Sequence, residues 1–90
     1  MDYFGFAIDI EGSLYISDTE RHEVIRYKLG DTRATIVAGG NGQGSRLCQL
    51  NHPTYVFVGN DSAVYVSDSW NNRVVKWEKG AKKGITVAGG

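Results

Sequence analysis

Short runs of apolar and β-branched residues, separated by polar clusters that contain glycine, make up most of the chain. Runs of this kind, bounded by turn-forming residues, are typical of β-strands. In the first half of the chain the predicted strands are residues 4–10, 14–17, 24–27 and 34–38. No segment has a sustained helical periodicity, and only residues 45–50 are expected to form a single helical turn.

The pattern repeats at an offset of fifty residues. Residues 14–18 (LYISD) fall on 64–68 (VYVSD), residues 24–27 (VIRY) fall on 74–77 (VVKW), and residues 37–40 fall on 87–90 (both VAGG). The substitutions within these blocks keep their residue type, which indicates a repeated structural unit. The repeat predicts eight short strands in two four-stranded meanders. We place the first unit in residues 1–40, a connecting loop in 41–53 and the second unit in 54–90.

Several predicted strands are apolar on both faces. Residues 64–66 (VYV) and 6–8 (FAI) do not alternate with polar residues, whereas an antiparallel sheet with one wet face alternates. Sheets that stack radially around an axis are covered on both faces. The pattern therefore favours propeller blades over an isolated meander or a half-barrel.

At this point the motifs resemble those of NHL repeats, the blade unit of one β-propeller family. The second unit carries the matching residues Pro53, Val64-Tyr65-Val66-Ser67-Asp68, Asn71-Asn72-Arg73-Val74, Gly80 and Ala88-Gly89. The first unit diverges: residues 20–24 (ERHEV) replace the Asn-Asn-Arg-Val block, and Tyr3 stands where Pro53 would. The resemblance covers essentially the whole chain.

The resemblance implies an all-β fold of two four-stranded antiparallel β-propeller blades. Propellers close with about 4–8 blades, so two blades leave one uncovered apolar face at each end. We expect the chain to complete a ring by oligomerisation with itself, through heterologous head-to-tail contacts. Six blades are common for NHL-like units, which favours a homotrimer, and an eight-bladed homotetramer is the alternative. The sequence leaves open whether the chain is a piece of a larger natural propeller or a designed or truncated unit.

Composition excludes several classes of protein. Ten Lys and Arg residues balance ten Asp and Glu residues over 90 residues, which is not the composition of a strongly basic nucleic-acid binder or an acidic disordered tail. The single Cys48 excludes an intrachain disulfide framework. No apolar run approaches the ~20 residues of a membrane span, so we expect no membrane partner. The N-terminus also lacks the apolar h-region of a signal peptide, so we expect no signal peptide.

The loops at one end of the blades are the candidate binding face. In such a blade the connection 39–53 and the turns 19–23 and 69–73 lie together, and loops on a rigid scaffold commonly carry function. Trp70 beside Arg73 suits an interaction hot spot for a protein or peptide ligand. The alternative is that Trp70 packs on the neighbouring loop and Arg73 pairs with an acidic side chain. The candidate residues are Trp70, Arg73, Asn71, Asn72, Arg21 and His22.

Other chemistry-bearing residues are expected to be structural. Asp18 and Asp68 occupy equivalent places, where each would accept hydrogen bonds from the backbone of the next turn rather than bind a metal or act as an acid or base. The glycine-rich run 39–44 lacks the lysine and helix of a phosphate loop. We expect a solvated His22, a His52 packed at the entrance of a strand and an inert Cys48 thiol, and therefore no catalytic residue, cofactor or metal.

Three functions remain in competition. The first is a non-catalytic propeller module that assembles with itself, a scaffold that presents the loop face. The second is a propeller that binds single-stranded RNA, as some NHL-like propellers do; zero net charge disfavours it. The third is a metal-dependent lyase-like propeller, which needs convergent ligands on the inner strands, where only Asp9 is found. The basic group Arg33, Lys79, Lys82 and Lys83 is expected to be a solvated edge on the opposite face.

Overall fold

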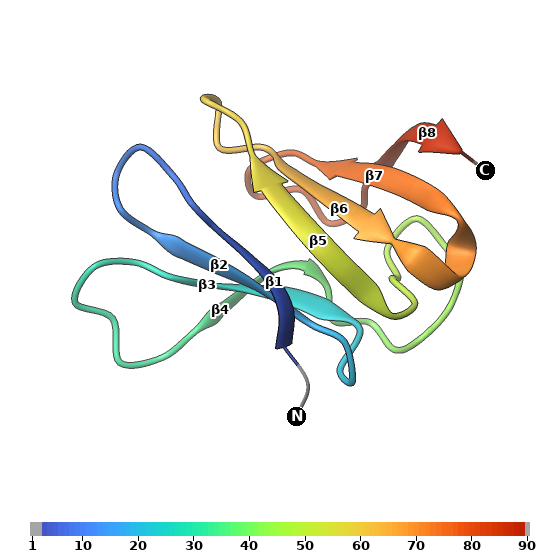
Figure 1. Ribbon diagram of the computed structural model, residues 1–90, viewed down its shortest axis with the longest axis horizontal. Helices are drawn as coiled ribbons and strands as arrows, with labels where there is room; N and C mark the ends of the chain where they lie inside the picture. The colour runs from blue at the N-terminus through green and yellow to red at the C-terminus, as the bar shows by residue number, and fades with distance from the viewer. Residues whose placement is uncertain (1–2, 90) are drawn as a thin grey trace.

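Every apolar run predicted as a strand forms one, and the strands assemble into two antiparallel sheets (Figure 1). The computed structural model describes residues 3–89, with the side chains of 5–89; Met1, Asp2 and Gly90, at the ends of the two predicted units, lie outside the described residues. Sheet 1 consists of β1 (Tyr3–Ile8), β2 (Leu14–Asp18), β3 (Glu23–Tyr27) and β4 (Thr35–Gly39). Sheet 2 consists of β5 (Pro53–Val58), β6 (Val64–Asp68), β7 (Arg73–Trp77) and β8 (Ile85–Gly89). The fold is therefore all-β.

The fifty-residue repeat is also a repeat of strand register. Leu14 pairs with Tyr27 in sheet 1, and Val64 pairs with Trp77 in sheet 2. The register shifts recur too, between Val24 and Ile25 on β3 and at the equivalent place on β7. Within residues 3–89 no helix is long and apolar enough to cross a membrane.

Several details differ from the predictions: β2, β3 and β4 are shifted or extended by one residue, and larger differences occur at β1, in the connection and at β5. The first strand ends at Ile8 because Asp9 forms a turn, in which its Oδ1 accepts the backbone N–H groups of Glu11 and Ser13, both at 2.9 Å. The helical turn expected at 45–50 is wrong: the segment is irregular, with one turn closed by Gln49 N–H donating to the Arg46 carbonyl. A short 3₁₀ helix, η1 (Ser69–Asn71), forms in the β6–β7 turn instead. β5 begins at Pro53, which the prediction placed in the connection.

The hydrophobic core lies between the two sheets. Tyr15, Val24 and Ala38 of sheet 1 face the side chains of sheet 2, and Leu50 of the connection joins them. The sheet 2 members of the core are Val64, Val66, Val75 and Trp77.

β1 and β5 lie side by side where the two sheets meet. Ser17 links them, because its Oγ accepts the Gly5 N–H at 2.8 Å and donates to the Thr54 carbonyl at 2.6 Å. A Cβ at Gly5 would lie 2.5 Å from that carbonyl oxygen, so the strands approach this closely only with glycine there.

Candidate functional site: the turn face and the open sheet faces

The connection and the β2–β3 and β6–β7 turns gather at one end of the two sheets, as the sequence predicts (Figure 1). The Trp70 N–H donates to the Asn51 carbonyl at 3.1 Å, and the His52 N–H donates to Nδ1 of His22 at 3.0 Å. We call this end, comprising residues 19–22, 41–52 and 69–72, the turn face. It joins segments that are far apart in the sequence.

Three rings form a ladder on the turn face. His52 stacks on Trp70, with ring centroids 3.4 Å apart and planes inclined by 17°. His22 contacts His52 in a T-shaped arrangement, with ring centroids 4.7 Å apart. Trp70 is still 63% exposed. The ladder links the β2–β3 turn of sheet 1, which holds His22, to the β6–β7 turn of sheet 2, which holds Trp70.

His22 is half-buried rather than solvated, contrary to the expectation from sequence. Burial lowers the pKa of His22, and the neighbouring His52 lowers it further, while Asp18 and Asp68 act in the opposite direction. The hydrogen bond from the His52 N–H requires an unprotonated Nδ1. Both effects favour the neutral ring.

Arg73 is occupied by structural contacts. Its Nε donates to Asp68 Oδ2 at 2.7 Å, and both side chains are buried. Its Nη1 donates to the Ser45 carbonyl at 3.0 Å, and its Nη2 donates to the carbonyls of Arg46 and Gln49, both at 3.1 Å. Arg73 therefore holds the connection onto sheet 2, which is the pairing that the sequence left open as the alternative to ligand binding.

Asn71 and Asn72 complete the β6–β7 turn. Asn71 Nδ2 donates to Asp68 Oδ2 and to the Gly44 carbonyl, both at 2.9 Å. Asn72 is exposed and adopts a left-handed conformation, with φ at 52°, at the end of η1. Asparagine tolerates this conformation better than most residues.

The two equivalent aspartates have different partners. Asp18 Oδ1 accepts the Arg21 N–H of the following turn at 3.1 Å, whereas Asp68 Oδ1 accepts the Asn51 N–H of the connection at 2.6 Å. Asp18 Oδ2 is buried and has no hydrogen-bond partner. Its cross-strand partner is Glu23, at the position that Arg73 holds in sheet 2, and burial and Asp18 together raise the pKa of Glu23.

Of the six candidate binding residues, Trp70, Arg21 and Asn72 remain exposed, while Arg73, Asn71 and His22 are engaged within the chain. The sequence placed His52 on this face, within the connection 39–53, but not among the candidate binding residues, although His52 contacts both Trp70 and His22. The stacking itself depends on how the sheets meet.

Two further features of the connection are structural. Gly39, Gly40 and Gly42 have positive φ, as expected for turn positions. Cys48 is a partly buried free thiol, and its carbonyl accepts a hydrogen bond from Asn41 Nδ2 at 2.8 Å. No cluster of three or more His, Cys, Asp or Glu side chains suited to a metal ion is found among residues that the structure describes.

Each sheet has an apolar face turned away from its partner. Cross-strand neighbours share a face, so Phe6, Ile16, Ile25 and Ile36 form one row on the side of sheet 1 opposite the core residue Tyr15. Phe6 is 71% exposed, and Ile8 on the same side is 63% exposed. We call this surface face A.

On sheet 2 the row that points away from sheet 1 consists of Phe57, Tyr65, Lys76 and Ile85. Phe57 is 65% exposed, and Tyr55 and Val87 are exposed as well. We call this surface face B. Exposed apolar areas of this extent are characteristic of interaction surfaces.

Comparison with known proteins adds no relative. No protein-family model matches the chain, and no curated protein matches it.

Proposed function

We propose that this chain is a non-catalytic β-propeller module of the NHL type, and that its principal activity is assembly with further copies of itself through faces A and B. In this proposal the two sheets are blades, and the turn face is presented to a protein or peptide ligand. Three chains would form a six-bladed ring, and four chains would form an eight-bladed ring.

The proposal rests on pairs of equivalent positions in the two repeats, of which one is buried between the sheets and the other is exposed. Phe6, Ile8 and Ile16 of face A are the fifty-residue equivalents of Val56, Val58 and Val66. Those three valines pack into the core between the sheets. A surface that is covered in one repeat is thus open in the other.

The residues of face B are likewise equivalent to sheet 1 residues that are buried in the core. Tyr65, Val74 and Ala88 correspond to Tyr15, Val24 and Ala38, which are the sheet 1 side of the core. A second chain could therefore place its face A on face B and repeat the contact that already exists within one chain. Such a contact is heterologous, and it closes into a ring when its rotation permits.

Analytical ultracentrifugation of the wild type and of single variants tests the assembly. We expect the wild type to have the mass of three chains at micromolar concentration. Ile8→Glu should block face A and Phe57→Glu should block face B, because a buried, unpaired carboxylate is strongly unfavourable. Each variant alone should be monomeric.

Mixing the two variants distinguishes a head-to-tail contact from a symmetric one. The intact face B of the Ile8→Glu chain and the intact face A of the Phe57→Glu chain should give a dimer that cannot grow. Leu29→Glu is the matched control, because Leu29 is an exposed apolar residue in the β3–β4 turn outside both faces. A monomeric wild type would refute self-assembly and would leave another protein, or further repeats of a longer chain, to cover the two faces.

Binding of single-stranded RNA, the alternative expected from the resemblance, finds less support. A surface for RNA needs cations beside stacking aromatic rings, and the sequence offers only Trp70, Arg73 and Arg21 for it. The Arg73 guanidinium is already bound to Asp68 and three carbonyl oxygens, so of these three only Arg21 and Trp70 stay exposed. Titration with oligouridine at low salt is the direct test. Salt-sensitive binding that is lost in Trp70→Ala would favour this alternative.

A further inference from the structure

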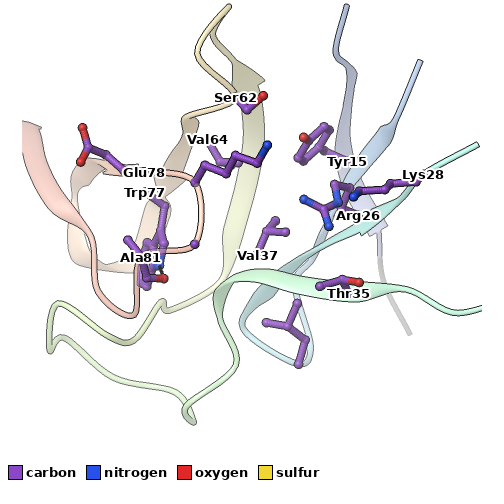
Figure 2. A pocket seen from close by; sticks show the side chains of 13 residues that line it. Tyr15, Arg26, Lys28, Thr35, Val37, Ser62, Val64, Trp77, Glu78 and Ala81 are labelled. Atoms are coloured by element: carbon purple, nitrogen blue, oxygen red, sulfur yellow. Dashed lines mark hydrogen bonds between the residues drawn. The ribbon is translucent and has the colours of Figure 1, made fainter. Parts of the chain in front are cut away.

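A cavity of about 330 Å³ lies between the two sheets towards their outer strands. Figure 2 shows Tyr15, Arg26 and Val37 on one side of it and Val64, Trp77 and Ala81 on the other. Its size lies within the range of about 300–1,000 Å³ that is typical of small-molecule sites. The cavity belongs to one chain, and its lining shares Ile36 with face A but no residue with face B or with the turn face.

Arg26 is an unusual residue for this place. It pairs across the sheet with Tyr15 and Thr35, and cross-strand neighbours share a face. Its side chain therefore extends from the side of sheet 1 that packs on sheet 2, as Figure 2 shows. The Nε atom is buried and has no hydrogen-bond partner.

The Tyr15 hydroxyl interacts with both the Arg26 guanidinium and the Asp9 carboxylate, and that carboxylate already has its own donors. Its Oδ2 accepts the Tyr15 hydroxyl at 2.9 Å, and its Oδ1 accepts two backbone N–H groups. A buried guanidinium N–H without an acceptor is unfavourable. An anion in the cavity would place an acceptor beside the Arg26 guanidinium, which lines it.

The charged lining of the cavity is predominantly positive. Arg26, Lys28 and Lys79 line it, against the single carboxylate of Glu78. Glu78 is exposed and lies 3.8 Å from Lys76, a residue outside the cavity, so part of its charge is offset there. The surplus of positive charge favours an anion.

Apart from the hydroxyl-bearing residues Tyr15, Thr35 and Ser62, the rest of the wall is largely apolar. Val37, Val64 and the Trp77 ring form much of them, and the only polar atom of the Trp77 side chain, Nε1, donates to the Ala81 carbonyl at 3.0 Å. A ligand would therefore meet apolar surface on one side and cations on the other, the combination that orients a small molecule in a pocket.

We infer that this cavity binds a small organic anion, with its carboxylate or phosphate group on Arg26 and the flanking lysines and its apolar body against Val64 and Trp77. The binding of such a ligand does not depend on ring assembly, since both walls come from the same chain. Carboxylates and phosphate monoesters share the required chemistry, because the guanidinium group binds both through paired N–H donors.

Amide and indole NMR signals provide a direct test, with phenyl phosphate and benzoate as probes. The chain has two tryptophans, and only Trp77 lines the cavity, so the Trp77 indole N–H should shift saturably while that of Trp70 should not. A ligand of this size is expected to have a Kd of about 0.1–5 mM. Inorganic phosphate and benzyl alcohol, which each retain only one half of the ligand, should bind at least several-fold more weakly.

Variants identify the residues responsible. Arg26→Gln should weaken phenyl phosphate binding at least tenfold, and the double variant Lys28→Gln with Lys79→Gln, which changes only exposed residues, should weaken it several-fold. Lys83→Gln, in the same turn as Lys79 but outside the cavity, should leave the affinity unchanged. The inference is overturned if the Trp77 signal does not saturate, if Trp70 shifts equally, or if the double variant binds like the wild type. Unchanged affinity in a folded Arg26→Gln variant would overturn it as well.

Discussion

Asp68 and Arg73 are direct cross-strand partners on β6 and β7, and they form a buried ion pair in which Oδ2 lies 2.7 Å from Nε. At the equivalent positions of sheet 1, Asp18 faces Glu23, a second carboxylate. The two sheets therefore share a backbone register but differ in charge at the same place. In sheet 2 the pair anchors the preceding connection, because Arg73 also binds three of its carbonyl groups.

Replacing Arg73 by Gln should strongly destabilise the fold. Removing one partner of a buried ion pair leaves an uncompensated charge and typically costs about 3–5 kcal/mol. Here three carbonyl groups of the connection lose their donor as well. We expect the urea midpoint, measured by tryptophan fluorescence, to fall accordingly.

Two further arginine variants set the scale for this loss. Arg73→Lys keeps a charge beside Asp68 but cannot reach the carbonyls in the same fork geometry, so its loss should be intermediate. Arg21→Gln, in the equivalent turn but exposed, should change the free energy of unfolding by no more than about 0.5 kcal/mol. If Arg73→Gln unfolds at the same urea concentration as Arg21→Gln, Arg73 does not anchor the connection.

Replacing Glu23 by Gln should stabilise the protein. Burial and Asp18 raise the pKa of Glu23, so the folded chain favours its neutral form. The folded state then binds more protons between the ordinary and the raised pKa, and stability rises as the pH falls through this window. At pH 7 we therefore expect Glu23→Gln to be more stable than the wild type.

The exposed Glu11→Gln in the β1–β2 turn is the control for Glu23→Gln and should have little effect. Thermal unfolding at pH 7 and at pH 5 separates the two variants, because the advantage of Glu23→Gln should shrink at the lower pH. If Glu23→Gln were stabilised equally at pH 7 and at pH 5, the repulsion between Asp18 and Glu23 would be contradicted.

The hydrogen bond between the His52 N–H and His22 Nδ1 predicts a second pH dependence. The pKa of His22 is lowered in the folded state, mainly by burial. The unfolded chain therefore binds more protons below the ordinary histidine pKa of about 6.5, and stability is lost as the pH falls from there to the lowered pKa. Thermal unfolding between pH 7.5 and pH 5 (about one unit on either side of this value) follows the loss.

His22→Asn is the informative variant for this dependence. Asparagine tolerates the positive φ of 54° at this position, and its amide oxygen can accept the same N–H without titrating. We expect this variant to lose less thermal stability between pH 7.5 and pH 5 than the wild type does. If the His22→Asn variant lost as much stability as the wild type over this pH range, His22 would not be the source of the pH dependence.

Leu50 should be essential for fixing the connection over the core. It is fully buried, and its side chain lies beneath Gly39. Leu50→Ala should cost about 2–5 kcal/mol, the usual range for a cavity left by leucine. Leu29→Ala, at a residue that is 90% exposed, should cost no more than about 0.5 kcal/mol. Equal urea midpoints for the two variants would show that the connection is not packed as described.

The strands and their order could be predicted from the sequence because their signals are local. The alternation of apolar runs with Gly, Asn and Asp clusters marks each strand, and the fifty-residue repeat gives the same register in both sheets. The end of β1 was missed because the Asp9 side chain forms a turn with backbone groups that follow it. The helical turn at 45–50 was wrong because Arg73, distant in sequence, holds that segment by the carbonyl groups of Ser45, Arg46 and Gln49.

The candidate site was predicted only in part. The sequence identified the three loops that meet on the turn face. It did not indicate which of their side chains would bind other groups of the same chain and so be unavailable to a ligand. Arg73 and Asn71 bind within the chain, and His52 joins His22 to Trp70. The inter-sheet cavity has no signal in the sequence, since its lining comes from both repeats.

By itself, the sequence determined that the chain forms two copies of one four-stranded antiparallel unit, because hydrophobic periodicity and turn residues act over a few neighbouring positions. Only the tertiary structure decided which face of each sheet is buried and which stays open. It also decided that Arg73 serves the fold and that the side chain of Arg26 extends into a cavity with its Nε unsatisfied. These outcomes depend on how the two sheets pack, and packing brings together residues that no local pattern relates.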